Sequence, residues 1–226
     1  MARQALRKER EVLGYLAKTI LKNQVPAVLG WEVGPEISAL TLEYLERKRV
    51  SSKVMAAGVV DFLSSMARLE AQTMSLKRFL AEVSHIHQKS YAEDDGLVCD
   101  ALEWLESCSR AGREICLHLS HGDFAPWNCM WTERGFFVFD WEESRQAEVA
   151  LADAFSYATS PAVHVAGRHN PERVFGRALD LGRYIARKTG WREDEVIVHY
   201  ALWIFPRLGR HTLYRKQLRM VLHRFQ

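Results

Sequence analysis

The feature that most constrains the fold is a segment in the middle of the chain, SHGDFAPWNCMWTERGFFVFDWEES, from Ser120 to Ser144. Short apolar runs, ICLHLS leading into it and NCMW and FFVFD within it, are separated by Gly, Pro and polar residues. Runs of this length bounded by turn-forming residues indicate strands and loops rather than helix. Because acidic residues follow these runs, the segment predicts loops in which carboxylates lie beside strand ends.

The sequence on either side of this segment has mostly helical spacing. Ser51 or Ser52 is a plausible N-cap, Gly190 a C-cap and Pro206 a helix break. The apolar periodicity predicts helices over residues 5–23, 51–69, 75–87, 96–112, 148–158, 171–190 and 191–226.

A small sheet is expected near the start of the chain. Residues 27–33 and 37–45 are β-prone, and Gly34-Pro35-Glu36 supplies a turn between antiparallel strands. A charged run follows, which suggests a boundary between residues 1–48, holding one helix and the hairpin, and a helical part over 49–226. The predicted fold class is α+β, mostly helical, with a reduced N-terminal lobe.

Composition limits the classes of function. The chain has 226 residues and is 48% hydrophobic, enough to bury a core as one domain or two small lobes. Its net charge is only +3, yet residues 162–226 hold 13 Lys/Arg against 5 Asp/Glu. This basic region suits nucleic acid or an anionic substrate, although solvated helix faces explain the same charge. Nucleic acid stays a minor alternative.

Cysteine spacing and apolar runs bear on the compartment. The four cysteines include no CxxC pair, so neither a zinc knuckle nor a thioredoxin-type motif is indicated. The first residues, MARQALRKER, are too polar for a signal peptide, and the longest apolar run, VIVHYALWIF, is about half of a membrane span. We expect a cytoplasmic protein with reduced thiols.

Three polar residues in the central segment point to one chemistry. Asp123 and Asn128 lie five positions apart in a loop, and Asp140 closes the following strand. Asn128 and Asp140 are hard oxygen ligands that suit Mg²⁺, which leaves Asp123 to accept a proton. Phosphoryl transfer from a nucleotide needs this division, and a kinase catalytic loop has the same Asp-to-Asn spacing with a later metal-binding Asp.

At these residues the chain resembles the aminoglycoside phosphotransferase and choline kinase superfamily. The motifs that carry the resemblance are HGDFAPWN and VFDWEES. It extends to LEYL, which looks like the hinge strand that meets the nucleotide base, to MARLEA and to ADAFSY. The similarity covers most of the chain from about Glu9 onward and implies a protein-kinase-like fold with a mostly helical C-lobe.

The resemblance also implies roles for individual residues. Asp123 would be the catalytic base, Asn128 and Asp140 the magnesium ligands, and His121 a brace of the loop. Glu142 would either touch metal through water or be merely exposed. Asp153 would accept hydrogen bonds from backbone donors of the loop or cap the next helix, and residues Glu43 to Leu45 would contact the nucleotide base. Glu9, or as a less favoured candidate Glu11, would correspond to the Glu of the family's first helix, and Trp127 and Trp141 would serve in packing.

The chain departs from the family pattern ahead of Glu9. Family members place strands with a phosphate-covering loop and a Lys before the first helix, whereas here Lys8, Lys18 and Lys22 lie on or beside that helix. Because this clamp positions the phosphates, its loss would slow transfer. Three explanations stay open: a late start codon, a minimal but active N-lobe, or a repurposed binding module.

The resulting functional prediction is a Mg²⁺-dependent small-molecule phosphotransferase that uses ATP or GTP and an alcohol acceptor. The alternative is a catalytically impaired kinase-like binding or scaffold module. Cationic aminoglycosides are disfavoured as acceptors, and a neutral or anionic sugar or glycan precursor is favoured. That preference rests on an Arg-rich C-terminal region: Arg168, Arg173, Arg177, Arg183, Arg187, Arg207, Arg210 and Arg215.

Overall fold

The computed structural model describes residues 2–34, 38–69, 71–87, 96–165, 169–209 and 211–224. Its helices are α1 (Ala2–Leu16), α2 (Ser52–Met66), α3 (Leu76–His87), α4 (Gly96–Arg110), α5 (Ala152–His164), α6 (Pro171–Thr189), α7 (Val196–Ile204) and α8 (Thr212–His223). Its strands are β1 (Val28–Val33), β2 (Ser38–Leu42), β3 (Gln72–Ser75), β4 (Glu114–Ser120), β5 (Cys129–Thr132), β6 (Gly135–Val138) and β7 (Arg145–Val149). Short 3₁₀ turns are η1 (Pro126–Asn128), η2 (Glu193–Glu195) and η3 (Phe205–Arg207). The α+β prediction is confirmed.

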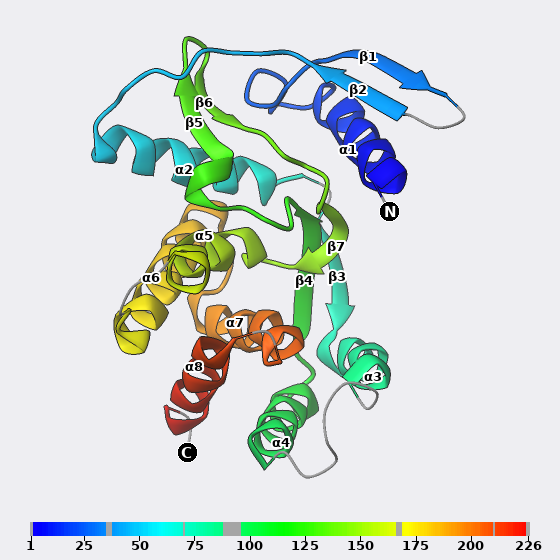
Figure 1. Ribbon diagram of the computed structural model, residues 1–226. Helices are drawn as coiled ribbons and strands as arrows, with labels where there is room; N and C mark the ends of the chain where they lie inside the picture. Colours follow the sequence, from blue (N-terminus) through cyan, green and yellow to red (C-terminus); the bar gives the residue numbers. More distant parts are fainter. Residues whose placement is uncertain are drawn as a thin grey trace.

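The strands form three small antiparallel sheets among the described residues. β1 pairs with β2, β4 lies between β3 and β7, and β5 pairs with β6. The β1–β2 ladder closes where Val33 faces Ser38, which confirms the predicted hairpin. Residues 35–37 of its expected turn lie outside the described residues. In Figure 1 this hairpin lies against α1, while β3 and β4 run through the middle of the molecule.

The predicted helix signals at Ser51, Gly190 and Pro206 are confirmed, whereas the predicted helix start at residue 191 is wrong, because α7 begins at Val196 after the η2 turn. Ser51, not Ser52, caps α2, because its hydroxyl accepts a bond from the Val54 N–H at 3.4 Å. Gly190 ends α6 with a left-handed φ of 78°, which costs a glycine little. α7 ends at Ile204, before Pro206.

The first helix is shorter than predicted. The periodicity extends to residue 23, but α1 ends at Leu16 and is followed by turns. The Thr19 hydroxyl explains the stop, because it donates to the Leu16 carbonyl (2.8 Å) and accepts from the Leu21 N–H (3.1 Å). Leu21 is nevertheless completely buried. The apolar residue that suggested a longer helix therefore packs into the core from a turn.

The sequence pattern does not predict two of the strands, β3 and β7. Residues 145–149 form β7, and α5 starts at Ala152 instead of near Glu148, after Leu151 takes a left-handed φ of 67°. Both β3 and β7 pair with β4, so the backbone bonds of that central strand override weak local preferences.

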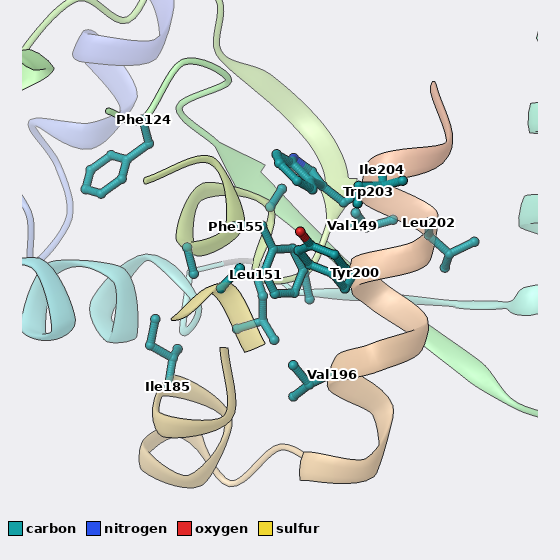
Figure 2. Packing of buried hydrophobic residues seen from close by; sticks show 14 of the residues in the cluster. Phe124, Val149, Leu151, Phe155, Ile185, Val196, Tyr200, Leu202, Trp203 and Ile204 are labelled. Atoms are coloured by element: carbon teal, nitrogen blue, oxygen red, sulfur yellow. The ribbon is translucent and has the colours of Figure 1, made fainter. Parts of the chain in front are cut away.

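The core is centred on α7, whose nine residues are all buried. Figure 2 shows Tyr200 and Trp203 of this helix beside Phe155 of α5, with the Phe155 and Tyr200 rings edge to face at 4.9 Å between centroids. No helix within the described ranges is both long enough and apolar enough to cross a membrane.

The boundary between two lobes near residue 48 stays a prediction. Residues 43–51 have no regular secondary structure, as a connection would. However, one hydrophobic cluster includes Leu13 and Leu16 of α1 as well as Leu218 of α8. The helix of the proposed first lobe therefore packs into the same core as the C-terminal helices.

Candidate active site

Asp153 fixes the loop that follows β4. Its carboxylate accepts bonds from the Ser120 hydroxyl (2.8 Å), the His121 N–H (2.8 Å) and the Gly122 N–H (3.3 Å). Asp153 is in the first turn of α5 and is only 2% exposed. Asp153 is expected either to accept bonds from backbone donors of the loop or to cap the next helix, and in the structure it accepts bonds from the loop. The sequence did not single out Ser120, although a hydroxyl directly before His-Gly-Asp is a usable signal.

Asp123 and Asn128 are in direct contact. The Asn128 side-chain nitrogen donates to the Asp123 carboxylate at 3.0 Å and to the Asp123 carbonyl at 2.9 Å. Asn128 is buried and ends the η1 turn, whereas Asp123 is half-buried. The bond holds the Asp123 carboxylate in one orientation and leaves the amide oxygen of Asn128 for another partner.

The segment that carries Asp140 crosses this loop closely. His121 Nε2 lies 2.9 Å from the Phe139 carbonyl, and the Phe139 N–H donates to the Asn128 carbonyl at 3.2 Å. At Gly122, with a φ of 85°, an added Cβ would lie 2.0 Å from the Glu143 carbonyl oxygen. Two segments distant in sequence are therefore packed backbone to backbone.

Asp140 is exposed and has a left-handed φ of 68°. Few residues other than glycine adopt this conformation, and strained backbone clusters at functional sites. Glu142, two positions later, is also exposed. The described part of the chain has no group of three or more His, Cys, Asp or Glu side chains placed to share a metal ion. The expected pair consists of one carboxylate and one amide, which falls outside that kind of group.

Glu9 links α1 to the Asp140 segment. Its carboxylate, on a residue only 7% exposed, accepts a bond from the Trp141 N–H at 3.1 Å. Burial raises the pKa of Glu9. The hydrogen bond from the Trp141 N–H lowers this pKa, and the negative charges of Asp140 and Glu142 raise it further. None of the ion pairs in the described ranges involves Glu9. Glu11 is exposed and pairs with Arg7 instead.

Glu43 and Leu45 lie apart from the loop. The Glu43 N–H donates to the Ala27 carbonyl at 2.9 Å, and its carboxylate forms an ion pair with Arg134 in the β5–β6 turn. No local pattern in the sequence indicates this ion pair. Leu45 is buried, and within the described ranges its backbone groups have no protein hydrogen-bond partner.

The two tryptophans of the central segment differ. Trp141 is completely buried, and its ring lies 4.6 Å from that of His121. Trp127 is 42% exposed, and its ring meets His164 edge to face at 5.8 Å. Trp141 therefore packs inside the site, while Trp127 stands at its surface.

The model of the phosphotransferase enzyme family (APH) matches residues 2–151. The chain belongs to this family, and the predicted membership is confirmed. The matched region includes the Asp123 loop and the Asp140 segment. No curated protein matches the chain at a significant level.

Solved structures of similar fold include kinases of small molecules. A thermostable mutant of aminoglycoside phosphotransferase APH(4)-Ia in its apo form has a TM-score of 0.63 at 14% identity, covering 97% of this chain and 83% of that one. A ternary complex of such a mutant with ADP and hygromycin B has a TM-score of 0.64 at 13% identity, covering 97% and 82%. Choline kinase from Cryptosporidium parvum Iowa II has a TM-score of 0.51 at 14% identity, covering 96% and 75%. These similarities establish the kinase-like fold.

Proposed function

We propose that this phosphotransferase moves the γ-phosphate of ATP or GTP to a hydroxyl group of a small molecule with the help of Mg²⁺. The observation that carries the proposal is the close crossing of the Asp123 loop and the Asp140 segment, fixed by the His121 side chain on the Phe139 carbonyl and by the Phe139 N–H on the Asn128 carbonyl. Phosphoryl transfer depends on holding a proton acceptor and phosphate-binding groups in one small space. The crossing supports such an arrangement.

In this proposal Asp123 is the catalytic base. It accepts or orients the proton of the attacking hydroxyl while that oxygen approaches the γ-phosphate in line with the leaving group. The bond from the Asn128 amide limits rotation of the carboxylate, which favours one productive orientation. In this proposal His121 and Asp153 hold the loop in place through hydrogen bonds and do not contact the reacting atoms.

Asn128 and Asp140 would hold the metal ion. The Asn128 amide nitrogen is already committed to Asp123, so the amide oxygen suits a cation, and the Asp140 carboxylate is exposed. Mg²⁺ prefers a few protein oxygens together with waters and phosphate oxygens, which fits this set. When bound, Mg²⁺ would offset the charge of the phosphates. Glu142 could reach the ion only through water.

The nucleotide would lie between the Asp140 segment and residues 43–45. The free backbone groups of Leu45 suit the edge of a purine base, whereas the Glu43 side chain serves the ion pair with Arg134. Glu9 positions the Asp140 segment by accepting a hydrogen bond from the Trp141 N–H. Similar folds have been solved with ADP or AMP-PNP, which supports a nucleotide as phosphate donor.

The acceptor site is proposed beside Trp127. α5 contacts the loop through Asp153 and Tyr157, and at its end His164 meets Trp127. A cavity of about 540 Å³ opens there between α5 and α8. The described residues lining it include three histidines and a lysine but no carboxylate: His164, His169, His211 and Lys216.

This lining favours a neutral or anionic acceptor, such as a sugar or glycan precursor, over a polycation. The arginine count is weaker support than the sequence suggested. Arg207 is buried over the Trp203 ring, and Arg187 pairs with Glu193 at the surface. Arg168 and Arg210 lie outside the described residues.

The test is turnover of ATP and GTP with Mg²⁺ over a panel of sugars, sugar acids, amino alcohols and aminoglycosides. We expect phosphorylation of a neutral or anionic hydroxyl compound, and a loss of about 10²–10⁴-fold in kcat for Asp123→Asn with nucleotide affinity retained. Glu133→Gln, an exposed acid in the β5–β6 turn, is the matched control. Nucleotide binding without turnover on any acceptor would favour the binding-module alternative instead.

A further inference from the structure

A second cavity lies between α1 and the sheet formed by β3, β4 and β7. It has a volume of about 360 Å³ and is enclosed by α1, β3, β4 and the chain around β7. Val12, Leu119 and the Tyr15 ring form its apolar lining, and the remaining lining residues are polar or charged. This size is at the low end for small-molecule sites. None of the residues given a role in phosphate transfer lines it.

One side chain in this cavity lacks a partner that the fold should supply. Ser144 is only 1% exposed, and its hydroxyl has no hydrogen-bond partner among the residues that the structure describes. Leaving a buried hydroxyl unpaired costs about 1–3 kcal/mol, so such groups are rare unless something else satisfies them. Ser144 is among the residues that line the cavity, and a rotation about its Cα–Cβ bond would turn the hydroxyl from its buried position toward a molecule there.

The charge of the cavity indicates what kind of molecule fits. Lys8 takes part in none of the ion pairs within the described ranges, whereas Glu11 pairs with Arg7 at 3.0 Å. Lys8 and Glu11 are the two charged residues of the lining, and Lys8 is the one without an ion-pair partner among the described residues. The amides of Gln72 and Gln146 add donors and acceptors near the unpaired hydroxyl. A small molecule with one anionic group and several hydroxyls matches this lining.

We propose that the cavity between α1 and β7 binds a small hydroxylated carboxylate, with its carboxylate on Lys8 and a hydroxyl on Ser144. Such a ligand would bridge the two elements that hold the Asp140 segment. The Ser144 N–H donates to the Trp141 carbonyl at 3.1 Å, and Glu9 of α1 accepts from the Trp141 N–H. Occupancy therefore stabilises the docking of α1 on this segment.

The consequence for function is regulation, and this part alone rests on the proposed nucleotide site. By linkage, a ligand that fixes α1 against the Asp140 segment tightens Mg²⁺-nucleotide binding, and the nucleotide tightens ligand binding by the same factor. We expect a coupling of about fivefold or more. Binding of the carboxylate itself requires neither metal nor nucleotide.

The experiment is a thermal-shift and calorimetric titration of the full chain with glycerate, threonate and gluconate. Glycerol and sorbitol are the uncharged controls, since sorbitol has the hydroxylated chain of gluconate without its carboxylate. We expect a saturable rise in Tm with at least one acid and none with the polyols. Absence of binding by all three acids, or equal binding of gluconate and sorbitol, would overturn the proposal.

Two variants separate the site from general effects. Ser144→Ala should leave the Tm of the free protein unchanged or higher, because the lost hydroxyl has no protein partner, yet weaken acid binding about tenfold. Lys8→Gln should abolish the response, whereas Lys18→Gln, an exposed lysine beyond the end of α1, should retain it. Asp123→Asn should bind the acid normally, which distinguishes failure of this inference from failure of the phosphotransferase proposal. Full retention of binding in Ser144→Ala and Lys8→Gln would contradict the assigned site.

Discussion

The two segments of the candidate site are held in different ways. The Asp123 loop is fixed from within the C-terminal part by Asp153 and by the bond between Asp123 and Asn128. The Asp140 segment is exposed, has a left-handed backbone at Asp140, and is attached to α1 through Glu9. The comparison suggests that the proton acceptor is pre-organised, whereas the metal-binding segment depends on where α1 lies.

The largest expected effect breaks the contact between the two segments. Gly122→Ala places a Cβ against the Glu143 carbonyl at a positive φ, so we expect a loss of about 3 kcal/mol or more in unfolding free energy. Gly112→Ala is the control, because Gly112 has a φ of 67° but open space around it, and should cost about 1–2 kcal/mol. Denaturant unfolding measures both. Equal losses would mean that the two segments do not touch.

The next effect concerns the pre-organised loop alone. Asp153→Asn replaces a carboxylate that accepts three bonds, so we expect a loss of about 2 kcal/mol. Asp180→Asn, whose side chain is 79% exposed, should change stability by less than about 0.5 kcal/mol. Denaturant midpoints would show the difference. If Asp153→Asn behaved like the control, the loop would be held by something other than this carboxylate.

The smallest effect is a pH dependence on the α1 side. Because burial raises the pKa of Glu9 above 4.5, the folded state binds this proton more tightly than the unfolded chain. The stabilisation is complete below pH 4.5 and is lost as the pH rises toward the raised pKa of the folded state. Glu9→Gln removes this dependence, so the Tm of the variant relative to wild type should increase over that range.

Glu11→Gln provides the control for that titration, since Glu11 is exposed on the same helix and pairs with Arg7. Its Tm difference from wild type should stay nearly constant with pH. A Glu9→Gln difference that is equally flat would show that Glu9 is not buried against Trp141 as described.

The candidate site could be predicted from the sequence because its polar residues lie close together along the chain. Asp123 and Asn128 lie within one short loop, so their spacing alone indicated a shared role, and the helix caps at Ser51 and Gly190 follow from local rules. Family membership and the α+β class were predicted for the same reason. The roles of Asp123, Asn128 and Asp140 remain proposals.

The parts that sequence missed depend on distant contacts. β7 has no alternating burial, since its first three residues are exposed, and only pairing with β4 makes it a strand. The contact of Gly122 with Glu143 and the Glu43–Arg134 pair each join segments that are distant in the sequence, and the burial of the unpaired Ser144 hydroxyl likewise depends on the packing of the folded chain. Such features become visible only when the chain is folded.

The most direct measurement is ATP affinity with and without Mg²⁺ for wild type, Asp140→Asn and Asp123→Asn. If Asn128 and Asp140 share one ion beside the nucleotide, Mg²⁺ will tighten ATP binding to wild type and to Asp123→Asn, and Asp140→Asn will lose most of that gain. An equal effect of Mg²⁺ on wild type and Asp140→Asn would contradict the convergence of the two segments on one metal site.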